Sequence, residues 1–593
     1  MNKVADSSFT ASNRDWLLKP VDERLLQRMI QLNDLPELAA RLLVMRGVTA
    51  ESAPDFLSPK LKNLLPDPYS LCDMEKAANR IAQAVMKGEK TGIFADYDVD
   101  GATAAALLMR FLYSAGLAEV RVYVPDRMTE GYGPNKAAFE QLQREGCIMV
   151  VTVDCGITAF EPLAHATAIG LDMVVLDHHQ AEPKLPAAIA VVNPNRLDDV
   201  AGMNDLAAVG VTFLTIVAVN RVLREAGWYA NRPEPDLREW LDLVALGTIC
   251  DVVPMRGINR AFVQQGLKAM GTLRNTGLAA LASLAGVSEP PTSFHAGFLL
   301  GPRVNAGGRV GKADIGAKLL STDDPLLAKD YAAALQQFND ERRFLEKQVL
   351  EEAMAMAEEQ QLKEKYHCVV VASNGWHQGV IGIVASRLVE RYRCPACVVA
   401  ITDGVGKGSG RSAAGFDLGG AVIKARENGL LLAGGGHYMA AGFSLEEKNI
   451  PLFLEFLHEK ASGVAADWKI LQPLQLDAMV AVSGANATLA QYLEQIGPYG
   501  SGNPESLVMI RQAIPFRVQP TTNGGHLRMM LLDPTGGERL KAIAFRADGT
   551  KLGDMLLRAG QEKQPLQLAG YLRVDRWNGQ ISCQFQVEDA ARF

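Results

Sequence analysis

Cysteine is scarce in this chain, and its thiols do not form the pattern of a disulfide framework or a zinc site. There are 8 cysteines in 593 residues, most of them in apolar surroundings, which is typical of reduced thiols in a reducing compartment. Cys394 and Cys397 have CxxC spacing, but no second pair or histidine cluster completes a zinc site. The cysteines therefore indicate buried structural residues, and we expect a cytoplasmic protein.

The chain also lacks long apolar runs and an excess of basic residues. The longest strongly apolar run, Leu206–Val219, is shorter than the roughly 20 residues that cross a bilayer, so it predicts a buried helix. The polar start of the chain resembles no secretory signal, and we expect no membrane partner. The formal net charge of −7 argues against a protein that coats nucleic acid, but it allows an enzyme with a local basic channel.

The length and the order of patterns predict an α/β protein of several domains. Residues 1–75 alternate short helical patterns with proline turns, which indicates an N-terminal arm or cap. Residues 76–327 alternate apolar strands with helices, which predicts a parallel sheet with right-handed crossovers. A proline-free and glycine-free helix over residues 328–361 is expected to connect this domain to a second, smaller α/β domain at residues 362–462.

The C-terminal part, residues 463–593, changes to a β pattern. Five short β segments are separated by Gly-Gly and Asp-Gly turn signals; they are expected at 508–518, 527–532, 540–545, 566–574 and 581–587. Five strands in about 120 residues suit a small barrel of the OB type. A β-sandwich is the alternative that this pattern leaves open.

Acidic residues follow three of the strands predicted in the parallel sheet. The strands at 91–95, 148–153 and 173–176 run into Asp96, Asp154 and Asp177. Ligands of such sheets bind beyond the carboxyl ends of the strands. We therefore expect these carboxylates to converge at one edge.

The first acidic cluster, Asp96-Tyr-Asp98-Val-Asp100-Gly101, concentrates three carboxylates within five residues. Hard divalent cations prefer oxygen ligands, so a Mg²⁺ or Mn²⁺ site would compensate this charge; a solvated acidic loop is the alternative. An EF-hand loop is excluded because Leu107 stands at the twelfth position, where that loop carries Glu.

Further candidate ligands follow along the chain. Asp177 is followed by His178 and His179, and Asp251 lies within an apolar stretch, where a buried carboxylate needs a partner. Together with Asp154 and the first cluster, these residues supply five to six carboxylates and one or two imidazoles. That inventory suits a two-metal site with ions roughly 3.5–4 Å apart, which hydrolyses phosphoesters without a covalent intermediate.

In this order, the motifs resemble those of the DHH phosphoesterase superfamily. DYDVDG, TVDCGI, DHH and Asp251 match its four motifs, and the strings VPDRMTEGYG from Val124 and GPRVNAGGR from Gly301 support the match. GSGRS from Gly408 and GGGH from Gly434 resemble its accessory DHHA1 domain, and GPYGSGNP from Gly497 resembles the start of an OB domain. The resemblance covers about residues 70–593 and is strongest to the single-strand-specific exonucleases.

The resemblance implies roles for individual residues. Metal-ligand positions are matched by Asp98, Asp100, Asp154, His178 and Asp251, with Asp154 as the bridge. Phe94 stands where many small DHH enzymes carry a histidine ligand, and Asp96 is expected to replace it. Asp177 is expected to orient a ligand, and His179 to contact the scissile phosphate.

Several basic and polar residues are predicted to bind substrate. Arginine suits bidentate phosphate recognition. We expect Arg303 and Arg411, with Ser409, to hold a terminal 5′-phosphate, and Arg127 or Arg309 to place the scissile one; surface salt bridges are the alternative. Asn305 and His437 are further predicted contacts, although the glycines before His437 also suit a tight turn. Trp376 and His377 could stack on a base or pack.

The function that this resemblance implies is metal-dependent 5′→3′ hydrolysis of single-stranded DNA to 5′-mononucleotides, in recombination and repair. Its expected partners are single-stranded DNA, a single-stranded-DNA-binding protein and a DNA helicase, and the protein is expected to be a monomer. Two alternatives within the same fold are an enzyme for short oligonucleotides or cyclic dinucleotides and a non-catalytic replication scaffold. A single-strand-binding protein built around the barrel is a third alternative, which the net charge of −7 disfavours.

Overall fold

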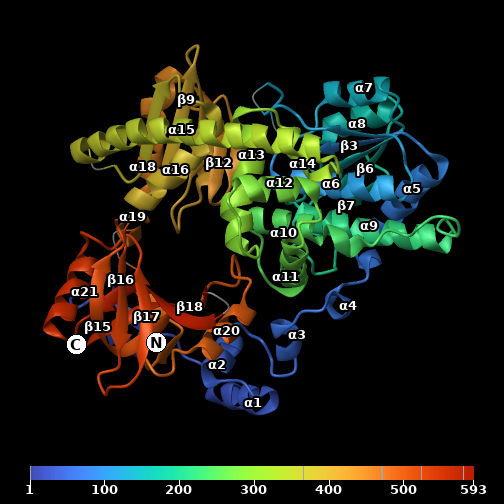
Figure 1. Cartoon of the computed structure of the whole chain (residues 1–593). Coiled ribbons are helices and arrows are strands. Elements are labelled where there is room, and N and C mark those ends of the chain that lie inside the picture. The colour runs from blue at the N-terminus through green and yellow to red at the C-terminus, as the bar shows by residue number, and fades with distance from the viewer. Residues whose placement is uncertain are drawn as a thin grey trace. The chain divides into compact units, whose positions relative to one another are not determined.

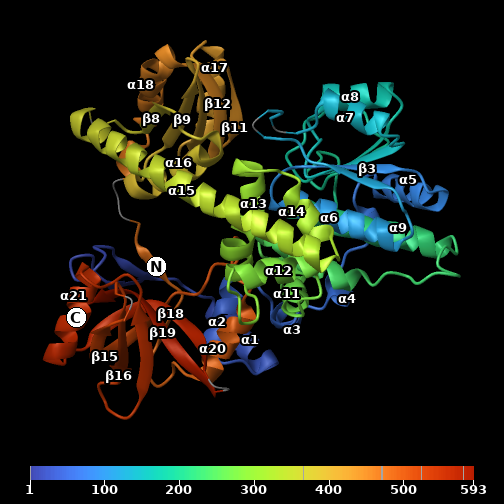
Figure 2. The ribbon, with the colours of Figure 1, turned by 45° about the horizontal axis from the view of Figure 1, so that its top comes forward.

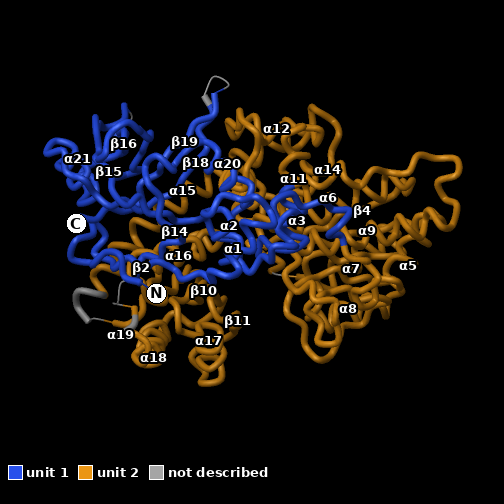
Figure 3. Tube along the Cα trace, turned by 90° about the horizontal axis from the view of Figure 1, so that it is seen from below, with its two compact units in different colours: residues 1–65, 254–264, 471–593 blue, residues 66–253, 265–470 orange. Residues whose placement is uncertain are grey.

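The computed structural model describes residues 2–593 except Met128, Tyr132, Lys365, residues 469–471, Asn523 and residues 578–579, and it leaves the side chains of residues 361–364, 466–467 and 577 undescribed (Figure 1). The chain divides into two compact units. The larger unit comprises residues 66–253 and 265–470, and the smaller unit comprises residues 1–65, 254–264 and 471–593 (Figure 3). Among the described helices, none is long and apolar enough to cross a membrane.

The larger unit contains a parallel five-stranded sheet in the order β4-β3-β5-β6-β7. Its strands are β3 (Thr91–Ala95), β4 (Val120–Tyr123), β5 (Met149–Val153), β6 (Asp172–Leu176) and β7 (Ala190–Val192). Every residue of β3 and β5 is buried, as expected of parallel strands covered on both faces. This confirms the predicted sheet.

Helices cover both faces of this sheet (Figure 2). One face carries α7 (Lys136–Arg144) and α8 (Phe160–Ala168), whose apolar residues share a core with Phe94 and Val175. The other carries α5 (Met74–Lys87), α6 (Val99–Ser114) and α9 (Ala208–Glu225). The apolar run at 206–219 thus forms most of a buried helix, as predicted.

A group of helices follows the sheet and ends in one long helix. Its members are η2 (Leu237–Trp240), α10 (Leu241–Cys250), α11 (Gly257–Gly271), α12 (Thr276–Leu284), the π-helix η3 (His295–Leu300), α13 (Gly301–Val310), α14 (Ile315–Ser321) and α15 (Pro325–Glu364). The short helix η1 (Pro68–Ser70) lies before α5. The 40-residue helix α15 confirms the predicted long helix. It packs against α13 and α16.

The second sheet of the larger unit has the order β11-β12-β10-β9-β8. Its strands are β8 (Val369–Asn374), β9 (Ala396–Thr402), β10 (Val405–Arg411), β11 (Ala433–His437) and β12 (Ala440–Glu446), with helices α16 (Gln378–Tyr392), α17 (Leu418–Glu427), η4 (Glu447–Asn449), α18 (Ile450–Ala461) and α19 (Ala465–Trp468). The glycines before His437 lie in strand β11, so their interpretation as a tight turn was wrong.

The smaller unit is built on a six-stranded sheet whose strand β15 also pairs with β18, so that the sheet curls into a barrel. The strands are β14 (Ala478–Val480), β15 (Val508–Pro520), β16 (Leu527–Leu532), β17 (Arg539–Ala544), β18 (Leu566–Trp577) and β19 (Gln580–Ala591), with helices α20 (Ala487–Ile496) and α21 (Lys551–Glu562). The five predicted β segments are confirmed, and β14 is an addition.

The first 65 residues share a hydrophobic core with this barrel. They form β1 (Asn2–Ala5), β2 (Trp16–Leu18), α1 (Glu23–Asn33), α2 (Glu37–Met45), α3 (Ala53–Leu57) and α4 (Leu61–Leu64). Strand β2 pairs with β13 (Leu474–Leu476), about 460 residues later in the chain. The buried guanidinium of Arg260 joins these segments by donating to Phe56 O, Gln495 O and Ile496 O.

Candidate active site

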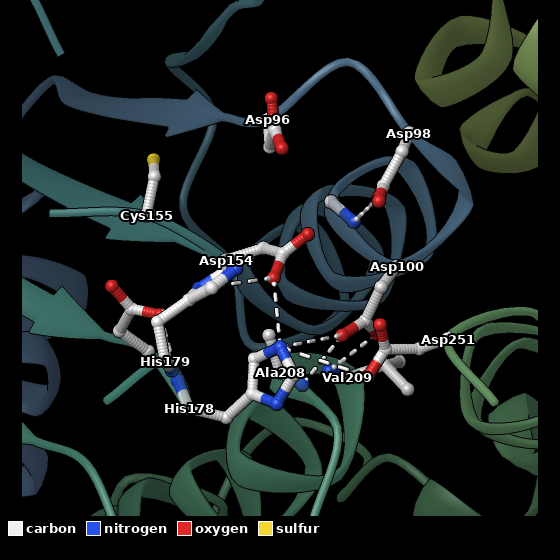
Figure 4. A network of polar contacts seen from close by, with 12 residues as sticks. Asp96, Asp98, Asp100, Asp154, Cys155, His178, His179, Ala208, Val209 and Asp251 are labelled. Carbon is white, nitrogen blue, oxygen red and sulfur yellow. Dashed lines mark hydrogen bonds and ion pairs between the residues drawn. The ribbon is translucent and has the colours of Figure 1, made fainter. Parts of the chain in front are cut away.

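The loop after β3 carries the first acidic cluster and opens helix α6. Asp98 caps this helix, since its Oδ1 accepts the Gly101 amide at 3.1 Å. A Cβ on Gly101 would lie 2.4 Å from the Asp96 carbonyl oxygen, so only glycine allows this tight loop. The Val99 amide donates to Asn305 Oδ1 at 3.1 Å. The loop is thereby fixed from both sides, and Asp96, Asp98 and Asp100 reach the sheet edge (Figure 4).

Asp100 is buried and is held by the start of helix α9. Its Oδ2 accepts the Ala208 amide at 2.6 Å, and its Oδ1 accepts the Val209 amide at 2.9 Å. Backbone amides at a helix N-terminus favour negative charge. They hold the Asp100 carboxylate in place but leave its charge without a nearby cation among the described side chains.

Asp154 follows β5 in a strained backbone conformation. Its φ of 62° lies in the left-handed region, which non-glycine residues rarely adopt and which is often found at functional sites. Asp154 Oδ1 lies 3.3 Å from His178 Nε2 and 4.0 Å from His179 Nδ1. The strain aims this carboxylate between the two histidines and the β3 loop (Figure 4).

Asp177 organises the two histidines that follow it. Its Oδ1 accepts the amides of His178 and His179 at 2.7 and 3.1 Å, lies 2.8 Å from His179 Nδ1, and its Oδ2 accepts the Ile157 amide at 3.0 Å. Burial alone would raise the pKa of Asp177, but these hydrogen bonds lower it. This fully buried carboxylate therefore stays ionised and fixes the histidine rings.

The two histidines are held in opposite protonation states. Burial and the neighbouring His179 lower the pKa of His178 to about 4, so its imidazole is neutral and suits a metal ligand. Burial would also lower the pKa of His179, but its hydrogen bond to Asp177 and the surrounding carboxylates raise it to about 9. At neutral pH, His179 is therefore an imidazolium, which suits contact with a phosphate.

Asp251 ends helix α10 and faces His178. Its Oδ2 lies 3.6 Å from His178 Nε2. This oxygen is buried and makes no hydrogen bond with any described group. An unsatisfied buried carboxylate oxygen is costly, and a bound cation would satisfy it.

Three sets of side chains have ligand atoms within 4.8 Å of one another: Asp96, Asp98 and Asp154; Asp100, His178 and Asp251; and Asp154, His178 and His179. Asp154 and His178 each belong to two of these sets. In Figure 4, dashed lines run from His178 to Asp154, Asp100 and Asp251. The structure thus brings all six predicted ligands to one edge, around Asp154.

The electrostatics of this cluster also fit divalent cations. Burial, followed by the charge of Asp98, raises the pKa of Asp96 to about 8 and that of Asp251 to about 7. Burial and neighbouring carboxylates raise the pKa values of Asp100 and Asp154 well above the usual range. Ionised together, these groups need positive charge between them, and oxygen-rich sets with one or two imidazoles suit Mg²⁺ or Mn²⁺.

A basic pocket of about 230 Å³ is also present in the larger unit, lined by Asp126, Arg127, Gly308–Gly311, Ala313 and His377. The Arg127 guanidinium lies over the Tyr97 ring, 5.2 Å from its centroid. Gly308 allows this arrangement because a Cβ there would lie 2.8 Å from Tyr97 O. Burial, followed by the charge of Arg127, lowers the pKa of Arg309 to about 10. Two neighbouring guanidinium groups thus favour an anion.

The other predicted phosphate contacts are only partly brought together. Arg411 and Ser409 lie on β10 with their side chains 3.3 Å apart, and the pKa of Arg411 is lowered by burial and then by the charge of Arg127. Arg303 instead donates to Leu299 O and to Gln336 Oε1 on α15. Among the described residues, its hydrogen-bond partners are these two groups and not Ser409 or Arg411.

The remaining candidates take different places. His437 is exposed at the end of β11. Trp376 is buried and donates its indole N–H to Glu352 at 2.7 Å, so it packs and does not present its face to a base. His377 caps α16 and lines the basic pocket. The contact from Asn305 to Val99 shows that this residue supports the β3 loop.

Sequence reasoning missed several supporting groups. The Ala208 and Val209 amides that hold Asp100 carry no side-chain signal, and only the tertiary structure reveals them. Tyr97 had a usable signal, since an aromatic residue between two candidate ligands must face either the core or the substrate side. Its contact with Arg127 links the acidic loop to the basic pocket.

Comparison with known proteins gives matches along most of the chain. Residues 90–248 match the DHH family N-terminal domain, residues 364–463 the DHHA1 domain and residues 476–589 the RecJ OB domain. The single-stranded-DNA-specific exonuclease RecJ of Bacillus subtilis is 33% identical over 586 residues, which cover 98% of this chain and 71% of that protein.

Solved structures agree with these matches. The crystal structure of RecJ from Thermus thermophilus in complex with Mn²⁺ superposes with a TM-score of 0.78 at 28% identity, covering 98% of this chain and 79% of that one. The corresponding structure in complex with Mg²⁺ gives a TM-score of 0.73 at 27% identity, covering 98% and 78%. The shared architecture extends over nearly the whole of this chain.

Proposed function

Because this chain belongs to the RecJ family of single-stranded-DNA-specific exonucleases, we propose that it hydrolyses single-stranded DNA from the 5′ end and releases 5′-mononucleotides. The observation that carries the proposal is the buried acidic cluster around Asp154, which includes an unsatisfied Asp251 oxygen and faces a protonated His179. A basic pocket in the same unit can hold a phosphate. Bound metal ions stabilise the charge that develops during phosphodiester hydrolysis, and a second phosphate contact positions the substrate.

The acidic cluster would hold two divalent ions, Mn²⁺ or Mg²⁺. We assign Asp96, Asp98 and Asp154 to one ion and Asp100, His178 and Asp251 to the other, with Asp154 shared. When bound, such ions lower the pKa of water and neutralise charge on a phosphodiester. The protein contributes the fixed carboxylates: amides of the β3 loop and of α9 hold Asp98 and Asp100, and Asp177 fixes the histidine pair.

The other residues of the site position the substrate. His179 carries an imidazolium at neutral pH and would contact the scissile phosphate; the ionised Asp177 keeps it protonated. Arg127 and Arg309 would bind a phosphate in the basic pocket, and Arg411 with Ser409 would bind the terminal 5′-phosphate. In this assignment, Arg303 does not bind the substrate. It joins α13 to α15 through its hydrogen bond to Gln336. His437, exposed at the end of β11, would contact the strand.

The two alternatives within this fold lack support. A non-catalytic scaffold would not need six candidate metal ligands around a shared carboxylate, and an enzyme limited to dinucleotides would not need the RecJ OB domain matched at residues 476–589. We further propose that the enzyme acts in the cytoplasm, as a monomer, in recombination and repair beside a helicase and a single-stranded-DNA-binding protein.

The proposal can be tested with three substrates in the presence of Mn²⁺. A long single strand, a blunt duplex and a dinucleotide are incubated with the full chain, and Asp154→Ala serves as the inactive control. Rapid release of mononucleotides from the single strand only is the expected result. Equal digestion of the duplex, or cleavage of the dinucleotide alone, would contradict it.

The phosphate assignment has its own test. Arg411→Ala is compared with the unmodified protein on strands with a 5′-phosphate and a 5′-hydroxyl. A charge-assisted contact contributes about 1.5–3 kcal/mol, so we expect the preference for phosphorylated ends to fall at least about tenfold. An unchanged preference would remove Arg411 from the 5′-phosphate site.

A further inference from the structure

Two large aromatic side chains are exposed together on the segment that packs against helix α10. Phe294 and Phe298 are 58% and 71% exposed. Their rings stack, with centroids 5.3 Å apart and planes 24° from parallel. Phe298 lies on the π-helix η3, and Phe294 immediately precedes it. A stacked, exposed phenylalanine pair is an apolar surface of the kind that marks an interaction site.

The aromatic pair is anchored to the segment that carries a candidate metal ligand. The Cys250 thiol contacts Ala296 O at 3.7 Å, and a Cβ on Gly301 would lie 2.4 Å from Cys250 Sγ. Cys250 directly precedes Asp251. The π-helix η3 therefore packs on the end of α10, where Asp251 faces His178.

Helix α13 continues from η3 and runs along the site to the basic pocket. Phe298 lies seven residues before Asn305 and eleven before Arg309, and η3 and α13 form one continuous helical segment that joins them. Asn305 holds the β3 loop through Val99, and Arg309 lines the basic pocket. Arg303, on the same segment, bonds to α15. The aromatic pair thus lies on the helical segment that also supports the β3 loop and lines the basic pocket.

The length of this helix sets the distance between the two features. Eleven residues separate Phe298 from Arg309, or roughly 16 Å at 1.5 Å per residue. A stacked strand advances about 3.4 Å per nucleotide, so the span corresponds to at most about five nucleotides. A strand whose phosphate occupies the basic pocket is therefore long enough to reach the aromatic pair within about five nucleotides.

We propose that Phe294 and Phe298 form a base-stacking platform that grips the single strand within about five nucleotides of the scissile phosphate. The inference rests on the proposed exonuclease function and adds a specific contact to it. Stacking on an aromatic face tolerates every base and requires an unpaired one. The platform would therefore select single strands without selecting sequence, and it would hold the strand while the terminal nucleotide is removed.

The platform can be tested by binding measurements on the full chain made inactive by Asp154→Ala. The ligands are 5′-phosphorylated oligothymidines with a 3′ fluorophore and one abasic site at each of positions 1 to 8. In the Asp154→Ala protein, one or two abasic positions should weaken binding about 5- to 150-fold, the range of a lost base–aromatic stack. Adding Phe294→Ala and Phe298→Ala should weaken binding of the intact strand similarly and abolish the sensitivity at those positions.

Two further variants control this experiment. Phe298→Trp keeps an aromatic face and should retain both affinity and the abasic signature. Tyr113→Ala removes an exposed aromatic residue at the far end of α6 and should change neither. Equal binding by the double alanine variant and its parent would overturn the platform and reassign this surface to a protein contact. Digestion by the unmodified protein tests the exonuclease function separately, so the two failures are distinguishable.

Discussion

Removing the divalent metal should make the larger unit less stable as the pH rises. Burial raises the pKa of Asp96 to about 8 and that of Asp251 to about 7, from an ordinary value of 3.8. A carboxyl group whose pKa is higher in the folded state contributes its full stability below the ordinary pKa and loses it as the pH rises through the folded value. The metal-free protein should therefore be more stable at pH 5.5 than at pH 8.5.

The magnitude follows from these two groups. One pKa unit corresponds to about 1.36 kcal/mol. As the pH rises from 5.5 to the folded pKa of each group, the contribution of Asp251 to the free energy of unfolding falls by about 2 kcal/mol, and that of Asp96 falls by about 3 kcal/mol. Bound metal should reverse the trend, because it requires the ionised ligands and competes with protons for them. Saturating Mg²⁺ should therefore stabilise the protein more at pH 8.5 than at pH 5.5.

The assay is urea unfolding of the full chain at both pH values, with Mg²⁺ or with EDTA, following the transition that Mg²⁺ shifts. Asp251→Asn should lose most of the metal response. Asp242→Asn is the matched control, since Asp242 is also buried with a pKa raised to about 6 but lies outside the acidic cluster; its metal response should persist. Equal stability of the metal-free protein at both pH values would refute the reasoning.

Three substitutions around the site have distinct expected outcomes. Asp177→Asn replaces an acceptor of four contacts and should lower metal affinity or activity about 10- to 100-fold, as measured by Mn²⁺ titration and turnover; an unchanged titration would contradict the support role. Tyr97→Leu should lower kcat/KM about 2- to 30-fold by removing the ring under Arg127, whereas Tyr97→Phe should retain activity; equal loss in both would exclude the ring as the cause. Gly101→Ala should destabilise the larger unit by about 1–3 kcal/mol and weaken metal binding, because its Cβ meets the Asp96 carbonyl; an unchanged melting curve would refute this.

The parallel sheet and the acidic edge were predictable because both depend on local pattern. Buried parallel strands appear as short apolar runs, and a strand that ends in aspartate places that residue at the edge where ligands bind. Strand β3 matched its predicted bounds of 91–95, and Asp96, Asp154 and Asp177 follow their strands as expected. His178 and His179 directly follow Asp177, so the strand predicted at 173–176 also placed the histidine pair at this edge.

The glycine-rich segments were harder to interpret because glycine serves close packing as well as turns. A Cβ on Gly408 would lie 2.2 Å from the Phe443 ring, and one on Gly410 would lie 2.8 Å from Leu418 Cδ2. These glycines make room within strand β10 for side chains that only the folded sheet brings near. Local sequence cannot distinguish this use from a turn.

Long-range contacts account for the remaining differences between the predictions from the sequence and the structure. The direction of Arg303 depends on the packing of α13 against α15, and the role of Asn305 depends on a loop two hundred residues earlier. The pairing of β2 with β13 joins segments at opposite ends of the chain. No periodicity within one segment encodes these contacts.

The central claim is tested most directly by following one long single strand labelled at either its 5′ or its 3′ end, with Mn²⁺ present. We expect immediate release of a labelled mononucleotide from the 5′-labelled strand, late release from the 3′-labelled strand, and no release by Asp154→Ala. Immediate release from the 3′ end, or equal activity of Asp154→Ala, would contradict a 5′→3′ exonuclease centred on Asp154.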